Sequence, residues 1–360
     1  MKKVLLCGNE AIAESAILAG CRFYAGYPIT PQNEITSYMS KYMPEAGGVF
    51  IQSESEISAI NIVFGAAVTG VRAMTSSSSP GISLKQEGIS YLAACELPAV
   101  IANIMRGGPG LWNIAPSQSD YFQAVKGGGH GDYHTIVLAP ASVQEMADLT
   151  TLAFDLADKY RTPVVILGDG ILGQMMAPVE FGTRNPALQG YGAGKRQGTR
   201  VEKDWVLDGC KGRKPRVINS LILAEGELER FNLKLQKKYN EIKNKEQRCE
   251  ILYGDDSELM LVAYGTPSRI ARSVVQKLRK TGKKVGMLRP LTLWPFPEKG
   301  LKKIAKKAKA FLVIEMSCGQ MIEDVKLSIG CSRPVYFYGR TGGEMPSEKE
   351  VISEIRKIYG

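Results

Sequence analysis

The sequence predicts an α/β protein in which a mainly parallel sheet is covered by helices. Short runs rich in β-branched residues alternate with longer helical stretches from Val4 to Gly170, and a second alternation begins at Leu259. A chain of 360 residues suits two domains of ordinary size better than a single core. Its 44% hydrophobic and 23% charged residues exclude disordered and collagen-like proteins.

The first alternation divides into elements in chain order. A strand at 4–6 precedes a helix at 10–19, and Gly20 is the left-handed residue expected where that helix ends. Loops that follow the strands of such a sheet lie at its carboxyl edge, where open α/β sheets bind ligands. The further strands predicted are 23–25, 48–52, 72–75, 99–105, 135–138 and 163–167, with helices at 56–69, 82–94 and 143–160.

A long irregular segment separates the two alternations. The periodicity fades from Pro178 to Arg216, and a charged helical stretch follows at 221–250. Because this segment exceeds an ordinary loop, we expect it to pack on a partner or cover a site. The second alternation predicts strands at 259–265, 285–288, 311–315 and 334–338, helices at 267–279 and 298–308, and a helix at the C-terminus.

Charge and cysteine usage limit the classes of function. The net charge of +10 is partly local, and the lysines at 302–309 have the spacing of a solvated helix face rather than of a nucleic-acid site. Nucleic-acid binding through this face and the basic linker stays an alternative of lower rank. The seven cysteines lie singly, without the close pairs of zinc or iron–sulfur sites, so any redox metal is expected on another chain.

The sequence also predicts a cytoplasmic protein. No apolar run reaches the roughly 20 residues that cross a bilayer. The opening from Met1 to Gly8 is too short for a signal peptide, so a soluble chain without a membrane partner is expected.

Four segments place glycine, proline, hydroxyl or charged residues directly after predicted strands. This is where the ligand-binding edge of the sheet should lie. The segments are Tyr27-Pro28-Ile29-Thr30-Pro31, Gln52-Ser53-Glu54-Ser55-Glu56, Thr75 to Gly81, and Arg106-Gly107-Gly108-Pro109-Gly110.

Glu56 opens a helix that is apolar on almost every face and is therefore expected to be buried. It shares one stripe with Ala59, Ile60 and Val63, so its carboxylate should point inward, where burial favours the protonated form of an unpaired acid. The alternative is a helix N-terminal charge, a role for which Glu54 competes.

In this order, the Tyr-Pro-Ile-Thr-Pro run, the helix entrance at Glu56 with Gly65 nine positions later, and the Arg-Gly-Gly-Pro-Gly run resemble the α subunit of the 2-oxoacid:ferredoxin oxidoreductases. The branched-chain, 2-oxoisovalerate type is the most similar. The resemblance covers residues 1 to about 180 strongly and 256–340 more loosely. It implies a pyrimidine-binding domain with a doubly wound sheet at 1–180, a linker or insertion at 181–255, and a transketolase C-terminal-like domain at 256–360.

The resemblance implies a thiamine diphosphate enzyme. In that family a carboxylic acid bonded to N1′ of the aminopyrimidine lets the 4′ nitrogen act as internal base, and Glu56 matches this position. Tyr27, Pro28 and Ile29 would line the cofactor site with Glu56. Thr30 and Arg106 would bind the substrate carboxylate through a hydroxyl and a guanidinium fork.

The resemblance also implies partners. Gly168-Asp169-Gly170 looks like the start of a thiamine diphosphate magnesium motif, but no asparagine follows at the family's spacing, so we interpret it as a strand-end turn. The diphosphate and Mg²⁺ would then lie on a β subunit, and iron–sulfur clusters on γ and δ subunits. The expected reaction is oxidative decarboxylation of a 2-oxoacid to its acyl-CoA, with electrons passing to ferredoxin.

Several alternatives stay open at this point. The substrate could instead be 2-oxoglutarate or pyruvate, and the chain could be a non-redox transketolase or decarboxylase. The serines at 75–79 either line the cavity or cap the next helix, with capping favoured. His130 and His134 are read as structural loop residues rather than bases. The aromatics at 290–297 form either an interface or core.

Overall fold

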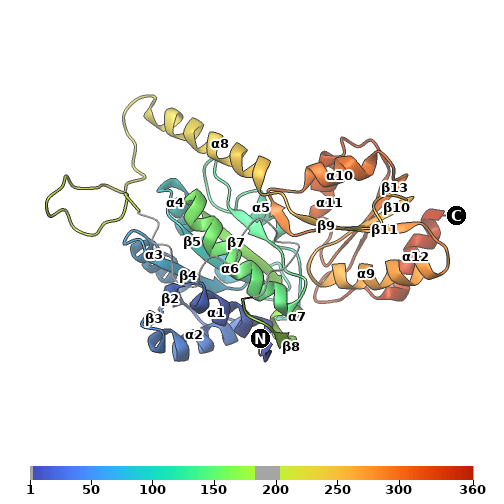
Figure 1. The fold of residues 1–360 in the computed structure, drawn as a ribbon, viewed down its shortest axis with the longest axis horizontal. Coiled ribbons are helices and arrows are strands. Elements are labelled where there is room, and N and C mark those ends of the chain that lie inside the picture. Colours follow the sequence, from blue (N-terminus) through green and yellow to red (C-terminus); the bar gives the residue numbers. More distant parts are fainter. Residues whose placement is uncertain (1–2, 183–202, 360) are drawn as a thin grey trace.

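The computed structural model describes residues 3–182 and 203–359 of the chain, which form two larger sheets flanked by helices (Figure 1). The seven-stranded sheet has the order β12-β6-β7-β5-β4-β2-β3, and the five-stranded sheet the order β14-β13-β10-β11-β9. The predicted α/β class with mainly parallel sheets is confirmed. The strands of the first sheet are β2 (Cys21–Gly26), β3 (Val49–Gln52), β4 (Arg72–Ser77), β5 (Ala99–Met105), β6 (Ile136–Leu138), β7 (Pro163–Asp169) and β12 (Thr292–Trp294).

Helices cover both faces of the seven-stranded sheet, which makes it doubly wound. Strand order reverses between β2 and β4: the chain moves outward from β2 to β3 and then returns past β2 to β4 and β5. Because parallel crossovers are right-handed, α1, α2 and α6 lie on one face and α3 and α4 on the other. The helices of this half are α1 (Gly8–Leu18), α2 (Asn33–Glu45), α3 (Glu56–Ala67), α4 (Ser79–Ala94), α5 (Tyr121–Val125), α6 (Val143–Tyr160) and α7 (Gly170–Gln174).

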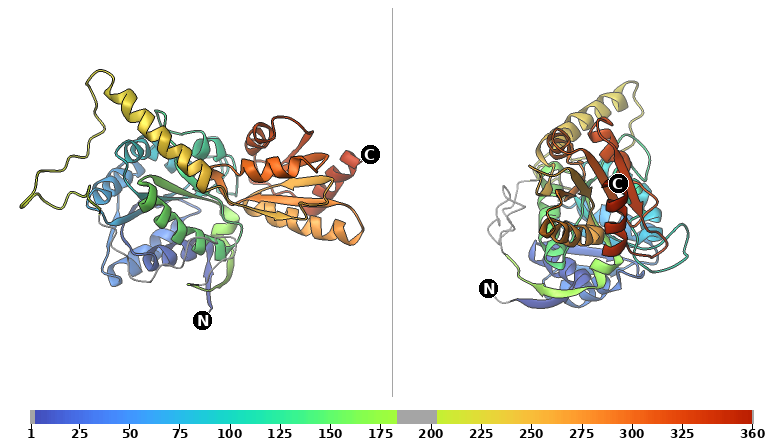
Figure 2. Two further views of the ribbon diagram at one scale, coloured as in Figure 1. Left: turned by 45° about the horizontal axis from the view of Figure 1, so that its top comes forward. Right: turned by 90° about the vertical axis from the view of Figure 1, so that its right-hand side faces the viewer.

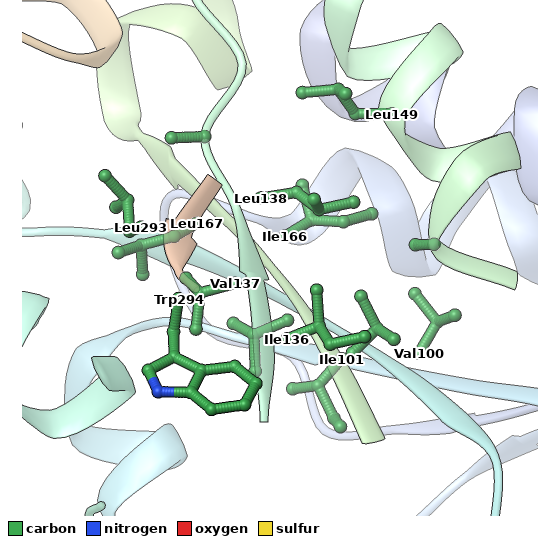
Figure 3. Close-up of a cluster of buried hydrophobic side chains, with 14 of the residues drawn as sticks. Val100, Ile101, Ile136, Val137, Leu138, Leu149, Ile166, Leu167, Leu293 and Trp294 are labelled. Atoms are coloured by element: carbon green, nitrogen blue, oxygen red, sulfur yellow. The ribbon is translucent and has the colours of Figure 1, made fainter. Parts of the chain in front are cut away.

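The core of this half lies around the central strands. Every residue of β5 is buried, as expected for a central parallel strand covered on both faces. Figure 3 shows apolar side chains from four neighbouring strands of this core, in the order β5, β7, β6 and β12. Those labelled include Val100 and Ile101 of β5, Ile166 and Leu167 of β7, Ile136, Val137 and Leu138 of β6, and Leu293 and Trp294 of β12. The predicted strand at 99–105 and helix at 143–160 match β5 and α6 to the residue.

The predicted first strand lies outside the parallel sheet. β1 (Val4–Cys7) pairs antiparallel with β8 (Met176–Val179) in a separate two-stranded sheet. Val4 and Leu5 are exposed, so only one end of β1 has apolar cover, and the following α1 packs on α6. A short strand with one covered end lacks the two-sided burial that a central parallel strand needs.

The five-stranded sheet forms the second half of the molecule. It is parallel except for β9, which pairs antiparallel with β11. Its strands are β9 (Cys249–Leu252), β10 (Leu259–Val262), β11 (Val285–Pro290), β13 (Ala310–Glu315) and β14 (Val335–Gly339), and its helices are α9 (Gly265–Lys280), α10 (Glu298–Ala305), α11 (Met321–Ser328) and α12 (Glu348–Tyr359).

The segment between the two alternations contains packed structure. Residues 183–202 of the predicted linker lie outside the described residues. The following chain pairs with the end of α3, where the Leu207 amide donates to the Val68 carbonyl at 2.8 Å. The helix α8 (Glu227–Lys245) then runs back toward the five-stranded sheet (Figure 2). It buries Leu235, Tyr239 and Ile242.

Two strands cross the limits predicted for the domains. β9 lies within the predicted linker but belongs to the five-stranded sheet. β12 comes from the C-terminal half and pairs with β6 at the edge of the first sheet. The surrounding Leu291, Leu293 and Phe296 are buried, so the aromatic run at 290–297 is core rather than an exposed interface. The division at residues 180 and 255 stays a prediction.

Asp169 joins the two halves at the end of β7. Its carboxylate accepts from the Leu172 amide at 3.1 Å, capping α7, and from the Thr266 amide and hydroxyl at 3.0 and 2.8 Å at the start of α9. Gly168-Asp169-Gly170 is therefore a strand-end turn, as predicted. Within the described residues, no group of three or more His, Cys, Asp or Glu side chains is arranged to hold a metal ion.

None of the helices in the described ranges combines the length and apolar character needed to cross a bilayer. The longest of them, α8, has 19 residues and carries several charges.

A buried ion pair also joins the halves and predicts a large stability effect. Arg289 of β11 donates to both oxygens of Glu145 of α6 at 2.8 and 2.7 Å, and to Glu250 of β9 at 3.0 Å. Arg289→Met removes the salt-bridge partner of Glu145 and leaves Glu250 with Arg272 alone, so we expect a loss of about 3–5 kcal/mol in unfolding free energy, most of it from the uncompensated Glu145. The measurement is the thermal unfolding midpoint of the chain in its native assembly.

The matched control removes an exposed pair. Glu298→Gln breaks the contact with Lys302 on α10, at 3.0 Å and one turn apart, and should change stability by about 0.5 kcal/mol or less. An Arg289→Met midpoint as close to wild type as that of Glu298→Gln would contradict the buried-pair account.

Candidate active site

Four strand ends bring the predicted site segments to one edge of the seven-stranded sheet. β5, β4, β2 and β3 are neighbours in that order and run parallel, so the residues that follow them share the carboxyl edge. Strand order reverses between β4 and β2, and such a reversal opens the crevice in which doubly wound sheets bind ligands. The predicted placement of all four segments at this edge is confirmed.

Glu56 is the first residue of α3 and is 6% exposed. The preceding Ser55 caps the helix by accepting from the Ser58 amide at 3.2 Å, so the carboxylate of Glu56 is not used for capping. The neighbouring Glu54 is exposed and bonds to the Ser55 hydroxyl. The alternative reading of Glu56 as a surface helix-end charge is therefore wrong, and the predicted inward direction is right.

The helix that Glu56 opens is buried on one side only. Glu56, Ala59, Ile60 and Val63 form the buried stripe, as predicted. The opposite side is exposed, where the large apolar residue Ile57 has 49% of its surface accessible. The expectation of a helix buried on every face is wrong, because α4, β2 and β4 pack against one side of α3 and leave its outer side to solvent.

The carboxylate of Glu56 lies against a glycine and a serine of the next strand and helix. A Cβ added to Gly81 of α4 would lie 2.5 Å from Oε1 and 2.9 Å from Cγ of Glu56, and closer still to Oγ of Ser77. Only glycine at position 81 therefore lets the two helices approach this closely. The buried Ser77 hydroxyl has no hydrogen-bond partner in the structure, so a polar group at this point is open to a ligand.

The serine run connects Glu56 to the Arg106 segment. Ser78 is the N-cap residue of α4 but its side chain makes no capping bond, and its buried hydroxyl lacks a partner. The prediction that the run caps this helix is therefore wrong. Ser79 accepts from the Arg106 amide at 3.1 Å and donates to Asp120 at 2.6 Å, so it fixes the start of the Arg106 loop.

The side chain of Arg106 contacts the backbone of Thr30. Nη1 of Arg106 donates to the Thr30 carbonyl at 2.9 Å, and the side chain is 7% exposed with its Nε unpartnered. Thr30 keeps its hydroxyl at the partly exposed surface, where it accepts from Asn33 at 3.4 Å. The structure brings these two predicted substrate residues together.

The Tyr27-to-Thr30 turn leaves β2 at the crevice. Tyr27 and Pro28 are exposed and Ile29 is half-buried. The turn is held from beneath by the buried Gln32, whose amide donates to the Tyr27 carbonyl at 3.2 Å and whose oxygen accepts from Ser76 of β4 at 2.5 Å. This link ties β2 to β4 at the point where the strand order reverses.

Lys85 is a site residue that the sequence reasoning missed. It is fully buried on the α3-facing side of α4, and its Nζ donates to the Glu56 main-chain carbonyl at 3.3 Å and to the Thr75 hydroxyl at 3.1 Å. Burial lowers its pKa to about 7, against the negative field of Glu56, which raises it. The signal was present in the sequence, since Lys85 falls on the stripe of Gly81, Gly88 and Leu92.

The two histidines lie away from this edge. His134 precedes β6 and so lies at the amino edge of the sheet, where it stacks on Trp294 with ring centroids 4.5 Å apart. Burial lowers its pKa to about 4. His130, in the same loop, packs edge-on against Tyr91. These ring contacts fit a structural role for both histidines, which stays a prediction.

Two family models match this chain. A family model described as pyruvate flavodoxin/ferredoxin oxidoreductase, thiamine diphosphate-binding, matches residues 14–214. A second, pyruvate:ferredoxin oxidoreductase core domain II, matches residues 257–351. The chain is 49% identical over its whole length to the ketoisovalerate oxidoreductase subunit VorB of Methanothermobacter marburgensis, covering 99% of that protein. It is 37% identical to the 2-oxoglutarate synthase subunit KorA of Methanothermobacter thermautotrophicus, with 98% of this chain and 97% of that protein covered.

Solved structures extend the comparison to the fold. The 2-oxoglutarate:ferredoxin oxidoreductase of Magnetococcus marinus matches with a TM-score of 0.85 and 26% identity over 99% of this chain, which spans 65% of that longer chain. A split-gene transketolase matches with a TM-score of 0.59 and 14% identity over 98% of this chain and 97% of that one, a likeness of fold alone. On the family models and the full-length identities, the chain belongs to the 2-oxoacid:ferredoxin oxidoreductases, as an α-type subunit of this thiamine diphosphate-binding family.

Proposed function

We propose that this chain is the α subunit of a 2-oxoacid:ferredoxin oxidoreductase that converts a branched-chain 2-oxoacid, 2-oxoisovalerate, to its acyl-CoA with electrons passing to ferredoxin. One observation carries the chemistry: a buried glutamate opens a helix in the crevice where the strand order reverses, beside an unpartnered serine hydroxyl. The choice of substrate rests on the 49% full-length identity to a ketoisovalerate oxidoreductase subunit.

The residues at the crevice fit the aminopyrimidine half of thiamine diphosphate. Glu56 supplies a buried carboxyl for a ring nitrogen, Gly81 leaves room in front of it, and Ser77 has a free hydroxyl. When bound here, the cofactor would supply the nucleophilic carbon that decarboxylation of a 2-oxoacid needs. Glu56 holds or shares the proton at the ring nitrogen, and the half-buried Ile29 with Tyr27 and Pro28 covers the ring from the β2 turn.

Arg106 and Thr30 suit the binding of the substrate carboxylate. The Arg106 guanidinium is anchored through Nη1 on the Thr30 carbonyl, which leaves its unpartnered Nε and its remaining amine available. A guanidinium held in this way fits a carboxylate with two parallel hydrogen bonds. The Thr30 hydroxyl adds a neutral donor beside it.

The remaining parts of the reaction are proposed to lie on partner subunits. A diphosphate with Mg²⁺ needs oxygen ligands, which we assign to a β subunit, and iron–sulfur clusters to γ and δ subunits that pass electrons to ferredoxin. Exposed apolar residues after Arg106 support a covering partner: Leu111 and Trp112 are 75% and 84% exposed. The chain is then inactive alone, and the complex works in the cytoplasm.

A 2-oxoglutarate oxidoreductase is the second candidate, because relatives named 2-oxoglutarate synthase subunit KorA are 37% identical over 98% of the chain. The two candidates differ in whether the pocket must accept a second carboxylate or an isopropyl group. Turnover of the assembled complex with 2-oxoisovalerate and with 2-oxoglutarate separates them. Preference for 2-oxoglutarate would overturn the branched-chain assignment while leaving the family unchanged.

Glu56→Gln tests the role of the carboxyl. The amide has nearly the same shape but cannot share the proton, so we expect the complex to assemble normally and kcat to fall by about 10²–10⁴-fold. The measurement is oxoacid-dependent dye reduction by the reconstituted complex. The matched control is Glu54→Gln, which neutralises the exposed acid at the same helix entrance and should leave kcat unchanged; equal rates for both variants would contradict the assignment of Glu56.

Arg106→Lys tests the carboxylate site while keeping the positive charge. An ammonium cannot make two parallel bonds to a carboxylate and hold the Thr30 carbonyl as well, so we expect kcat/KM for the oxoacid to fall about ten- to hundredfold. The rise in KM with each oxoacid is the measurement. Arg230→Lys, on the exposed part of α8, is the control, and unchanged oxoacid KM in Arg106→Lys would contradict the role of Arg106.

A further inference from the structure

Lys85 is buried at a position where an apolar side chain would cost less free energy to bury. It lies between Gly81 and Gly88 on the side of α4 that faces α3, and none of its surface is accessible. At Gly88 an added Cβ would lie 2.5 Å from Ile60, so the two helices pack closely on both sides of Lys85. Lysine is almost never fully buried unless its charge has partners.

The hydrogen bonds of Lys85 connect two parts of the site rather than stabilise a distant fold element. Its Nζ donates to the main-chain carbonyl of Glu56, in the first turn of α3, and to the hydroxyl of Thr75, inside β4. Both of these partners are neutral oxygens, and burying a charge without an opposite charge bonded to it costs free energy of folding. Stability therefore does not explain why an ammonium is placed here.

The surroundings make Lys85 the group whose charge changes near neutral pH. Burial lowers its pKa to about 7. On β2, which packs against α3, burial raises the pKa of Tyr24 and raises the pKa of Cys21 to about 12, so both stay neutral. β4 contributes hydroxyls, and Glu56 is the charged group of α3 that acts on Lys85.

We propose that Lys85 is a positioning residue for Glu56: its ammonium holds the Glu56 main-chain carbonyl and the Thr75 hydroxyl, and so fixes the first turn of α3 that carries the Glu56 carboxyl. The inference rests on the proposed function of Glu56 toward the aminopyrimidine. Charge-assisted bonds are about twice as strong as neutral ones, so loss of the Lys85 proton weakens its hold on the Glu56 carbonyl and loosens the first turn of α3.

The sign of the pH effect follows from linkage. Cofactor binding favours the ammonium form of Lys85, so affinity is highest below the pKa of this lysine and falls as the pH rises through it. The phosphates of the cofactor titrate alike in every variant, so the difference between the wild-type and variant curves belongs to the protein.

The experiment measures the dissociation constant of thiamine diphosphate by calorimetry on the assembled complex stripped of cofactor, between pH 6 and 9. The wild type should weaken as the pH rises through a midpoint near 7. Lys85→Met should lose this transition and bind with the weaker, high-pH affinity throughout. Lys303→Met, at an exposed lysine of α10, is the matched control and should follow the wild-type curve.

A second variant keeps the charge and moves the midpoint. Thr75→Val removes one acceptor of the ammonium, which disfavours the charged form, so the midpoint should shift to lower pH. A wild-type curve in Lys85→Met overturns the inference; where that variant does not assemble, an unshifted midpoint in Thr75→Val overturns it. Glu56→Gln separates the two proposals. If this variant binds the cofactor and turns over like the wild type, the proposed function of Glu56 is refuted. If Glu56→Gln is impaired while Lys85→Met behaves like the wild type, only the role of Lys85 is refuted.

Discussion

The close approach of α4 to the first turn of α3 is the constraint on which the rest of the site depends. Gly81 and Gly88 remove the side chains that would separate the two helices, and the space between them holds Glu56 and Lys85. A carboxyl and an ammonium withdrawn from water interact far more strongly than at the surface. The opposite side of α3, which carries Ile57, stays exposed.

Much of the fold could be predicted from periodicity because the central elements are uniformly apolar or strictly amphipathic. β5 and α6 match to the residue, since a strand covered on both faces and a helix with one buried stripe leave clear patterns. Short strands leave no clear pattern. β12 has three residues between prolines, and β9 lies in a charged stretch. The apolar run of β1 predicts a strand, but nothing in its four residues specifies the strand with which it pairs.

The site residues likewise divide into those that the sequence could place and those that it could not. Glu56, Thr30 and Arg106 could be placed at one edge because each follows a strand, and parallel strands share that edge. The serines could not be assigned, because capping and cavity-lining use the same hydroxyls and only the folded geometry shows that Ser78 caps nothing. Lys85 was missed because a lone lysine in a helix normally reaches solvent, and its burial depends on the tertiary contact with α3.

Strand β12 makes the two halves depend on one another, because it comes from the C-terminal half and pairs with β6 of the N-terminal sheet. The C-terminal half gives three residues to the edge of the N-terminal sheet, and the Asp169–Thr266 contact fixes the opposite side of the joint. A protein cut between the sheets would expose the free backbone of β6 and the apolar face under Trp294, which invites aggregation. Each half is therefore a poor candidate for separate expression. Exchanging one half between relatives would also require matching residues where β12 pairs with β6.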